Sequence, residues 1–224
     1  MIDPNEKEAD DSSVDEQQKS SMTVVSITGG IGSGKTTVAQ IARDAGFKVI
    51  SSDDKAKELM ASDPEVMSEL VDEFGADTYL PDGKLNSAFI AGIVFADDKN
   101  AAKSLAKLNS IVHPSVIQSM INETARYEAE GEKLLFVESA LVFEAGLEDG
   151  FDYIIVVDAS EEISIERVMK RSGLTSEQVQ RRIDEQIPRS GKKAHADFVI
   201  SNNGSVDDLK KSATMIINII SQIA

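Results

Sequence analysis

The chain has 224 residues, a formal net charge of −16, no cysteine and two histidines. This length fits one α/β domain with a small added subdomain. The composition excludes a disulfide framework, a thiolate zinc site and a histidine metal cluster. The acidic balance argues against nonspecific binding to nucleic acid or to an anionic membrane, because either partner requires a basic face. No apolar run approaches a membrane span and the N-terminus lacks a signal-peptide pattern, so we expect a cytoplasmic protein.

Residues 1–21 form an acidic leader with seven acidic side chains, two basic ones and almost no apolar content. This composition predicts a disordered segment. A disordered segment of this kind could be a regulatory tail, or it could be a solvated leader without a regulatory role. We expect the folded domain to span residues 22–224.

A glycine-rich segment, which we call the phosphate loop, covers residues 28–37 (TGGIGSGKTT) between a strand-like run and an apolar stripe of helical spacing. It matches the pattern G-x-x-x-x-G-K-[ST]. Such a loop turns backbone N–H groups toward phosphate, while its lysine reaches the β- and γ-phosphates and its hydroxyl ligates Mg²⁺. A glycine-rich turn with a chance lysine is the alternative, and the flanking strand and helix count against it. The predicted ATP-binding residues here are Gly30, Ile31, Gly32, Ser33, Gly34, Lys35, Thr36 and Thr37, with Thr36 as the metal ligand.

A second short strand is predicted at residues 47–50, and Asp53 and Asp54 follow it. Ligand groups gather at the carboxyl ends of parallel strands, so a carboxylate here should lie near the phosphate loop. Either aspartate could instead cap a helix that begins at Lys55. One aspartate could cap the helix while the other acts at the phosphate loop.

Four helices are predicted before the third strand, over residues 64–74, 86–95, 97–109 and 114–130. Four are too many for one simple crossover, so residues from about 64 to 125 should form an inserted helical subdomain that holds the non-nucleotide substrate. His113 would lie at the junction of the last two helices. A lone histidine is more often structural than functional.

Three continuous apolar runs, residues 134–137, 153–158 and 196–201, are typical of buried parallel strands, and a closing helix is predicted at 206–223. The alternation predicts an α/β fold with a parallel five-stranded sheet wrapped by helices. Glu138 follows the third strand, where a carboxylate could support bound Mg²⁺ or serve as an ordinary cap.

Arginine and lysine concentrate between residues 161 and 195, against the acidic balance of the whole chain. Phosphoryl transfer needs cations around the transferring group, and arginine fits phosphate oxygens as a fork. We therefore predict an arginine-rich helical lid, although helices with ordinary solvated faces would also fit. Arg167 and Arg171, four apart on one helical face, are the predicted catalytic pair.

These segments together resemble the dephospho-coenzyme A kinases, a phosphate-loop family similar to the nucleoside-monophosphate kinases. The phosphate loop alone is shared by many kinases. The ordered set of motifs is more specific: VISSD at 49–53, DGKL at 82–85, LNSIVHP at 108–114, LVFE at 141–144, RIDEQ at 182–186 and ADFVISNNG at 196–204.

The resemblance implies ATP-dependent phosphorylation of the ribose 3′-hydroxyl of dephospho-coenzyme A, with Mg²⁺ bound to ATP. Lys35 would act with the arginines, Asp53 would accept the proton of the 3′-hydroxyl, His113 and Glu144 would contact this substrate, and Asn202 would contact the adenine of ATP. The expected partners are ATP and dephospho-coenzyme A, without nucleic acid or membrane, and the expected state is a monomer or weak homo-oligomer.

Two other functions would use a phosphate loop. Another small-molecule or nucleotide kinase of the same architecture is the alternative within enzymes. A GTP-dependent switch protein would need an N-K-x-D guanine motif, which the chain lacks.

Three positions depart from the family's usual pattern. Ser51 replaces the first aspartate of V-I-D-A-D, so only Asp53 can carry that motif's acid. Ser87 stands where the family usually has arginine, and Ala140 replaces the usual proline before L-x-F-E. The last two changes fall at an expected substrate contact and in the loop before Glu144.

Overall fold

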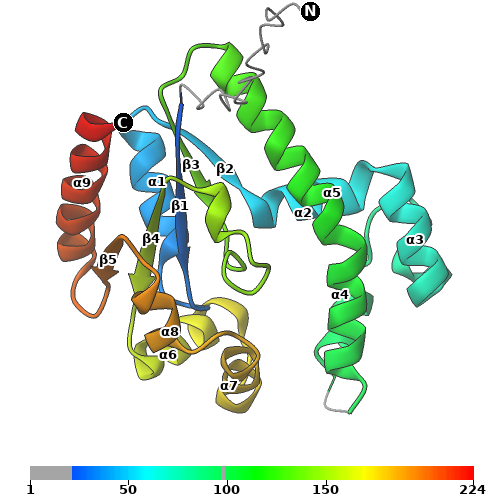
Figure 1. The fold of residues 1–224 in the computed structure, drawn as a ribbon. Coiled ribbons are helices and arrows are strands. Elements are labelled where there is room, and N and C mark those ends of the chain that lie inside the picture. The colour runs from blue at the N-terminus through cyan, green and yellow to red at the C-terminus, as the bar shows by residue number, and fades with distance from the viewer. Residues whose placement is uncertain (1–21, 97–98) are drawn as a thin grey trace, which may run out of the picture.

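A computed structural model describes residues 22–96 and 99–224 (Figure 1). The predicted acidic leader lies outside the described residues. All strands pair in parallel in a five-stranded sheet of order β2-β3-β1-β4-β5. The predicted sheet is therefore confirmed. Its strands are β1 (Thr23–Gly29), β2 (Lys48–Ser51), β3 (Leu134–Glu138), β4 (Tyr153–Asp158) and β5 (Phe198–Ser201).

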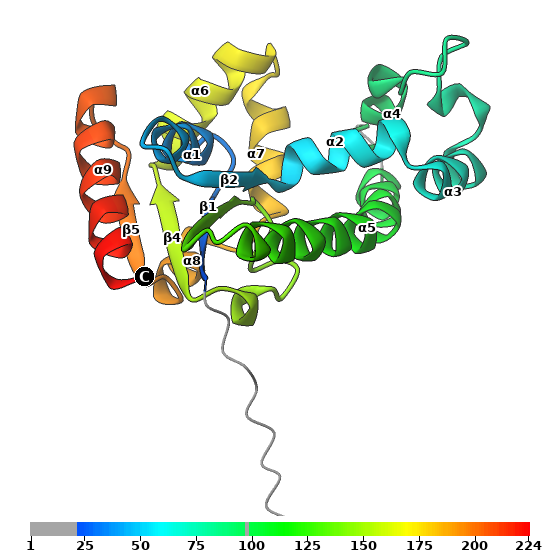
Figure 2. The same ribbon diagram turned by 90° about the horizontal axis from the view of Figure 1, so that it is seen from above.

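Helices cover both faces of the sheet, which explains why its strands are mostly apolar on both sides. Helices α1 (Lys35–Asp44) and α9 (Val206–Ile223) pack on the face formed by side chains such as Ile27 and Phe136. The long helix α5 (Ala101–Ala129) packs on the other face, against Leu135 and Val137. Figure 2 shows α1 and α5 on opposite sides of the strands. Neighbouring residues of β3 thus enter two separate cores.

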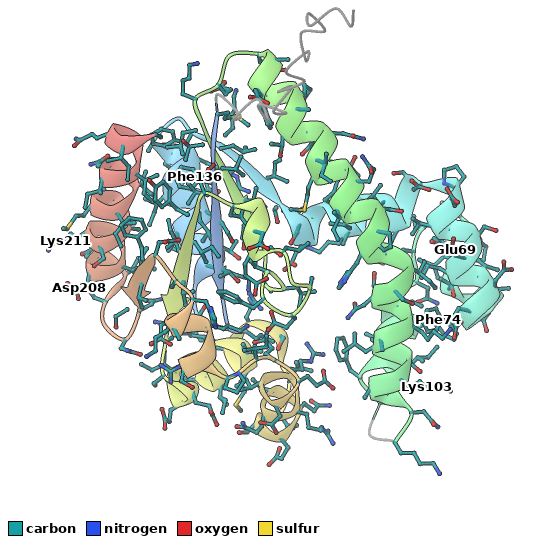
Figure 3. All side chains as sticks on the ribbon, viewed as in Figure 1. Glu69, Phe74, Lys103, Phe136, Asp208 and Lys211 are labelled. Atoms are coloured by element: carbon teal, nitrogen blue, oxygen red, sulfur yellow. The ribbon has the colours of Figure 1, made fainter. Side chains whose placement is uncertain are left out.

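A group of helices between β2 and β3 extends away from the sheet, as Figure 1 shows. It comprises α2 (Ser52–Ser62), α3 (Pro64–Phe74), the short η1 (Ala76–Thr78), α4 (Ser87–Val94) and the first part of α5. In Figure 3, Phe136 lies among the strands, whereas Phe74 and Lys103 lie out in this group. We call residues 64–125 the insertion. The described residues contain no helix long and apolar enough to cross a bilayer.

Local sequence sets the ends of the insertion's helices. Asp63 caps α3 by accepting hydrogen bonds from the backbone N–H groups of Glu65 and Val66, and Pro64 occupies the first helical position. Proline is suited to that position because its missing N–H would be unpaired anyway. Asn86 caps α4 in the same way through the Phe89 N–H at 3.2 Å. The predicted bounds of α3 and the predicted cap of α4 are confirmed.

The prediction of two helices over 97–109 and 114–130 is wrong, because α5 runs unbroken from Ala101 to Ala129 with Pro114 inside it. A proline within a helix removes one backbone hydrogen bond and costs about 3 kcal/mol. Val112, Val116 and Met120 are buried on either side of the proline, and burial of each such side chain contributes about 1.5–3 kcal/mol. Tertiary packing therefore stabilises the helix enough for it to continue past Pro114.

Three helices, α6 (Glu161–Ser172), α7 (Ser176–Asp184) and α8 (Arg189–Ala194), gather at the end of the sheet toward which the strands point. Ser160 caps α6, and Thr175 forms a capping box with Gln178 at the start of α7. Gly173 ends α6 with a left-handed φ of 69°, a conformation that glycine adopts without strain. We call residues 161–195 the lid.

Candidate active site

The phosphate loop joins the carboxyl end of β1 to the first turn of α1. Gly32 and Gly34 have φ angles of +75° and +100°, where side chains are strained. A Cβ added to Gly32 would lie 2.5 Å from the Ser164 carbonyl oxygen of α6, and one added to Gly34 would lie 2.3 Å from Asn202 Nδ2. These glycines therefore serve close packing as well as backbone shape.

A cleft of about 380 Å³ opens beside this loop. The predicted catalytic residues Lys35, Asp53, Arg167 and Arg171 all line it, although they come from α1, α2 and α6. Its full lining is Ile31, Gly32, Gly34, Lys35, Thr36, Thr37, Asp53, Ala140, Arg167, Val168, Arg171 and Gln186. The fold thus brings the predicted acceptor carboxylate and the predicted phosphate-binding groups to one space.

Lys35 is the cation of the phosphate loop, and burial lowers its pKa because the charged form loses solvation. Asp53 and Glu138 oppose this shift, whereas Lys192 and Arg171 add to it. Four ionisable groups from four other segments therefore act on the charge of Lys35. An anionic phosphate beside Lys35 would restore the stabilisation that burial removes.

The predicted metal ligand, Thr36, donates a hydrogen bond from Oγ1 to Glu138 Oε1 at 2.5 Å. Glu138 is buried at the end of β3. Hydroxyl and carboxylate oxygens are hard ligands that suit Mg²⁺. Among the described residues no group of three or more histidine, aspartate or glutamate side chains could hold a metal ion alone. Such a site fits an ion held mostly by substrate phosphates.

The two aspartates after β2 have different surroundings. Helix α2 begins at Ser52 and not at Lys55, and its cap is Ser51, whose Oγ accepts from the Asp54 N–H at 3.4 Å. The alternative in which one of the aspartates caps this helix therefore does not hold. Asp54 faces solvent, where a hydrogen bond from Lys57 (Nζ to Oδ1, 3.0 Å) lowers its pKa. Asp53 lines the cleft.

A smaller apolar pocket of about 70 Å³ lies on the other side of Asp53. His113 lines it together with Val116 and Met120 of α5 and Leu141. Burial lowers the pKa of His113, so its neutral form is favoured. His113 and Asp53 therefore border one space despite their distance in sequence, and the predicted substrate contact of His113 remains a prediction.

Glu144 contacts two residues of the lid, Ile187 and Lys192. Its Oε1 lies 2.7 Å from Lys192 Nζ of α8 and accepts a hydrogen bond from the Ile187 N–H at 3.2 Å. The Lys192 side chain is only 2% exposed, so this ion pair is buried. The predicted substrate contact of Glu144 stays a prediction, since in this structure its carboxylate holds α8.

Asn202, predicted to contact adenine, lies under the phosphate loop and is 5% exposed. Its Nδ2 donates to the Ser33 carbonyl oxygen at 2.7 Å, and its Oδ1 accepts from Arg167 Nη2 at 3.3 Å. One amide therefore joins the end of β5, the phosphate loop and the lid. The adenine contact itself remains a prediction.

Some lid cations neutralise acids of the fold. Arg189 donates two hydrogen bonds to Asp158, from Nε at 2.8 Å and from Nη2 at 3.0 Å, and Lys193 adds a third at 3.3 Å. Burial alone would raise the pKa of Asp158, but Arg189 and Lys193 outweigh it and hold this pKa below its usual range. Arg189 and Lys193 are therefore paired with Asp158 at the end of β4. The arginines that line the cleft are Arg167 and Arg171.

Gln186 was not predicted as a site residue. It lines the cleft, and its Oε1 accepts a hydrogen bond from the Ile31 N–H of the phosphate loop at 2.9 Å. The RIDEQ motif, which ends at this glutamine, was the signal available in the sequence.

A model of the dephospho-CoA kinase family matches residues 23–208. The chain belongs to this family. The predicted family and α/β phosphate-loop kinase fold are both confirmed. A dephospho-CoA kinase from Corynebacterium glutamicum is 37% identical over 202 residues, which cover 90% of this chain and all of that protein. One from Listeria innocua is 37% identical over 84% of this chain and 92% of its own.

Solved structures share this fold, and one of them is a dephospho-CoA kinase. The crystal structure of TT1252 from Thermus thermophilus has a TM-score of 0.71 and 32% identity, and covers 91% of this chain and 98% of that one. Dephospho-CoA kinase from Campylobacter jejuni has a TM-score of 0.64 and 29% identity, with 89% and 97% covered. A shikimate kinase from Acinetobacter baumannii, at 12% identity and a TM-score of 0.50, shares the fold only.

The structure places the three residues that depart from the dephospho-CoA kinase pattern. Ser51 caps α2 and so helps to place Asp53 in the first helical turn. Ala140 lines the cleft. Ser87 is the exposed first residue of α4. Two of the three departures therefore adjoin the predicted reaction centre.

Proposed function

We propose that this protein transfers the γ-phosphoryl group of ATP to the ribose 3′-hydroxyl of dephospho-coenzyme A, giving coenzyme A and ADP in the last step of coenzyme A biosynthesis. The observation that carries the proposal is the cleft itself, where Asp53 borders the same space as Lys35, Arg167 and Arg171. Membership of the dephospho-CoA kinase family supports the choice of substrate. We expect a monomer or weak homo-oligomer in the cytoplasm, and light scattering would test the oligomeric state.

The phosphate loop would bind the triphosphate through its backbone N–H groups and through Lys35, at the start of α1 where the helix dipole favours an anion. Arg167 and Arg171 lie in α6 across the cleft and would stabilise the charge of the transferring group. Mg²⁺, when bound with ATP, neutralises charge on the phosphates. Thr36 would hold this ion, with Glu138 orienting the threonine hydroxyl through their hydrogen bond.

Asp53 would orient the acceptor. The 3′-hydroxyl oxygen forms a bond to the γ-phosphorus, the bond from that phosphorus to the bridging oxygen of ADP breaks, and the hydroxyl proton passes to Asp53. Phosphoryl transfer has a loose transition state and depends mainly on positioning and charge. The carboxylate thus acts as much by holding the hydroxyl in line as by removing its proton. The apolar pocket lined by His113, next to Asp53, is the proposed contact surface for the acceptor.

The test is an assay of the purified protein with ATP, Mg²⁺ and dephospho-coenzyme A, in which we expect coenzyme A and ADP in equal amounts. Adenylate and cytidylate serve as competing acceptors. Consumption of ATP with either nucleotide but not with dephospho-coenzyme A would contradict the substrate assignment. Clear preference for GTP over ATP in a binding titration would contradict the donor assignment.

A further inference from the structure

Gln186 lies in the connection between α7 and α8 and reaches the phosphate loop from the side of the lid. Its Oε1 accepts the hydrogen bond from the Ile31 N–H, although the two residues are 155 positions apart in sequence. The same oxygen would lie 3.6 Å from a Cβ placed on Gly30, so the amide lies alongside the first turn of the loop. This contact is made by the fold and not by sequence neighbours.

The amide also separates two spaces. Gln186 and Ile31 line both the phosphate cleft and a neighbouring cavity of about 350 Å³. In the cleft the charged side chains are Lys35, Asp53, Arg167 and Arg171. In the cavity behind it they are Glu161, Asp184, Arg189 and Lys192. Gln186 is therefore the uncharged polar side chain between these two groups of charges.

The backbone around Gln186 is anchored on both sides. The Gln186 N–H donates to the Ile183 carbonyl oxygen at 3.0 Å, at the end of α7. The next residue, Ile187, donates its N–H to Glu144, which pairs with buried Lys192. The position of the side chain is thus set by α7, by α8 and by the loop after β3.

The orientation of the amide follows from its partner. A glutamine side chain has an acceptor oxygen and two N–H donors. The Ile31 N–H can only donate, so it must face the oxygen. Within the described residues, no hydrogen bond uses the two donors on Nε2. Gln186 lines the cleft together with Lys35, Asp53, Arg167 and Arg171, so these donors are open to a phosphoryl group bound there.

We propose that Gln186 is a further catalytic residue, whose Oε1 holds the Ile31 peptide in place while its Nε2 donates to an oxygen of the γ-phosphoryl group during transfer. This inference rests on the proposed function. A neutral donor stabilises phosphoryl oxygens as their charge is redistributed, and it costs no change of charge in a cleft that already holds three cations. Holding Ile31 and the phosphoryl group with one side chain would also fix the distance between them.

Gln186→Glu separates the two parts of this proposal. The substitution keeps an acceptor oxygen for the Ile31 N–H but replaces the donors with a carboxylate that repels the γ-phosphoryl group. We expect kcat at pH 8 to fall by about 10²–10³-fold, the effect of removing one donor from a transition-state site, with a smaller change in KM for ATP. Protonation of the glutamate restores a neutral donor, so the ratio of variant to parent activity should rise at least tenfold as pH falls from 8 to 5.5.

Gln178→Glu is the matched control. Gln178 lies in α7, the helix before the connection that carries Gln186, in an exposed capping box, and glutamate serves that position equally well. This control should keep the parent's activity and the parent's pH profile. Gln186→Met, which lacks both donor and acceptor, should lose activity to a similar degree with no recovery at low pH. Melting temperatures of all variants exclude loss of folding.

Two results would overturn the proposal: a Gln186→Glu variant as active as the parent at pH 8, or a loss of activity that is the same at every pH. The second result would mean that Gln186 only supports the loop. The proposed function fails separately, because a parent protein that makes no coenzyme A would show this before any variant is compared.

Discussion

Hydrogen bonds from distant segments hold the phosphate loop, whereas mainly apolar side chains hold the insertion against the sheet. Asn202, Gln186 and Glu138 each bond a different residue of the loop or its helix. The insertion instead packs side chains such as Leu70 and Val112 against Leu135 and its neighbours. Hydrogen bonds fix direction as well as distance, while apolar packing fixes position more loosely. We therefore expect substitutions near the loop to change catalysis, and those in packed joints to change stability or substrate binding.

The largest expected effect is that of Lys35→Ala. Loss of a cation from a phosphoryl-transfer site lowers turnover by about 10³–10⁵-fold, and here it should also weaken ATP binding, because the proposed role of Lys35 is to bind the phosphates. Folding should survive, since burial disfavours this cation in the free protein. Initial rates and an ATP titration are the measurements. Unchanged ATP affinity with less than a tenfold loss of rate would contradict the role given to Lys35.

Asp53→Asn comes next. It keeps the shape of the side chain and removes its charge, so kcat should fall by about 10²–10⁴-fold, the usual contribution of general base catalysis. ATP affinity should hardly change, because the proposed role of Asp53 is to orient the acceptor and not the nucleotide. Steady-state rates at saturating dephospho-coenzyme A, together with ATP binding, provide the measurement.

Asp54→Asn is the control for Asp53, since Asp54 is the adjacent carboxylate but forms its ion pair with Lys57 at the exposed surface. It should keep its turnover and lose less than about 1 kcal/mol of stability, as is typical of surface ion pairs. If Asp54→Asn abolished turnover while Asp53→Asn kept most of it, the wrong carboxylate would have been assigned.

Lys192→Met should lower the stability of the folded chain. It leaves the largely buried carboxylate of Glu144 without its cation, and breaking one partner of a buried ion pair costs about 3–5 kcal/mol. Urea unfolding measures this free energy. The double variant Lys192→Met with Glu144→Leu should recover most of the loss, because no unpaired charge remains. If the double variant is no more stable than the single one, the ion pair is not the cause.

The smallest effect is expected where the lid meets the insertion. Arg182 of α7 places Cζ 3.7 Å from the ring centroid of Phe95, which follows α4. Such a cation–π contact contributes about 0.5–2 kcal/mol. Arg182→Lys loses the stacked guanidinium and should raise KM for dephospho-coenzyme A by up to about tenfold, with little change in kcat. A double-mutant cycle with Phe95→Leu measures the coupling, and fully additive effects would show that this contact does not join lid and insertion in solution.

Local patterns were enough to predict several elements with their bounds. The sequence placed α3, β4 and α9 where the structure has them, because caps, proline and apolar spacing act within a few residues. The same local rules failed at Pro114, where burial of side chains from α5 against the sheet outweighs the cost of the proline. They also placed the start of α2 too late, since Ser51 and not an aspartate is its cap.

Only those site residues that belong to a sequence motif or a regular spacing could be predicted. Lys35, Asp53, Arg167 and Arg171 were found from spacing and resemblance, and they do line one cleft. The bond between Gln186 and Ile31 could not be found in that way, because no periodicity joins residues more than 150 positions apart. The engagement of Glu144 by Lys192 is of the same kind. Three-dimensional contact, and not residue type, decides which polar side chains remain free for substrate.

The order of the strands has a consequence for synthesis of the chain. The strand β1 is central in the sheet, and both of its neighbours, β3 and β4, begin more than 100 residues later. A nascent chain emerging from the ribosome therefore carries an unpaired, apolar β1 until the whole insertion has been made. Unpaired strand edges favour aggregation, and long-range parallel pairing is slow. The amide of Asn202, which holds Ser33, comes later still. A ribosome-bound chain stopped before residue 198 should thus contain every residue of the phosphate loop and yet bind ATP weakly.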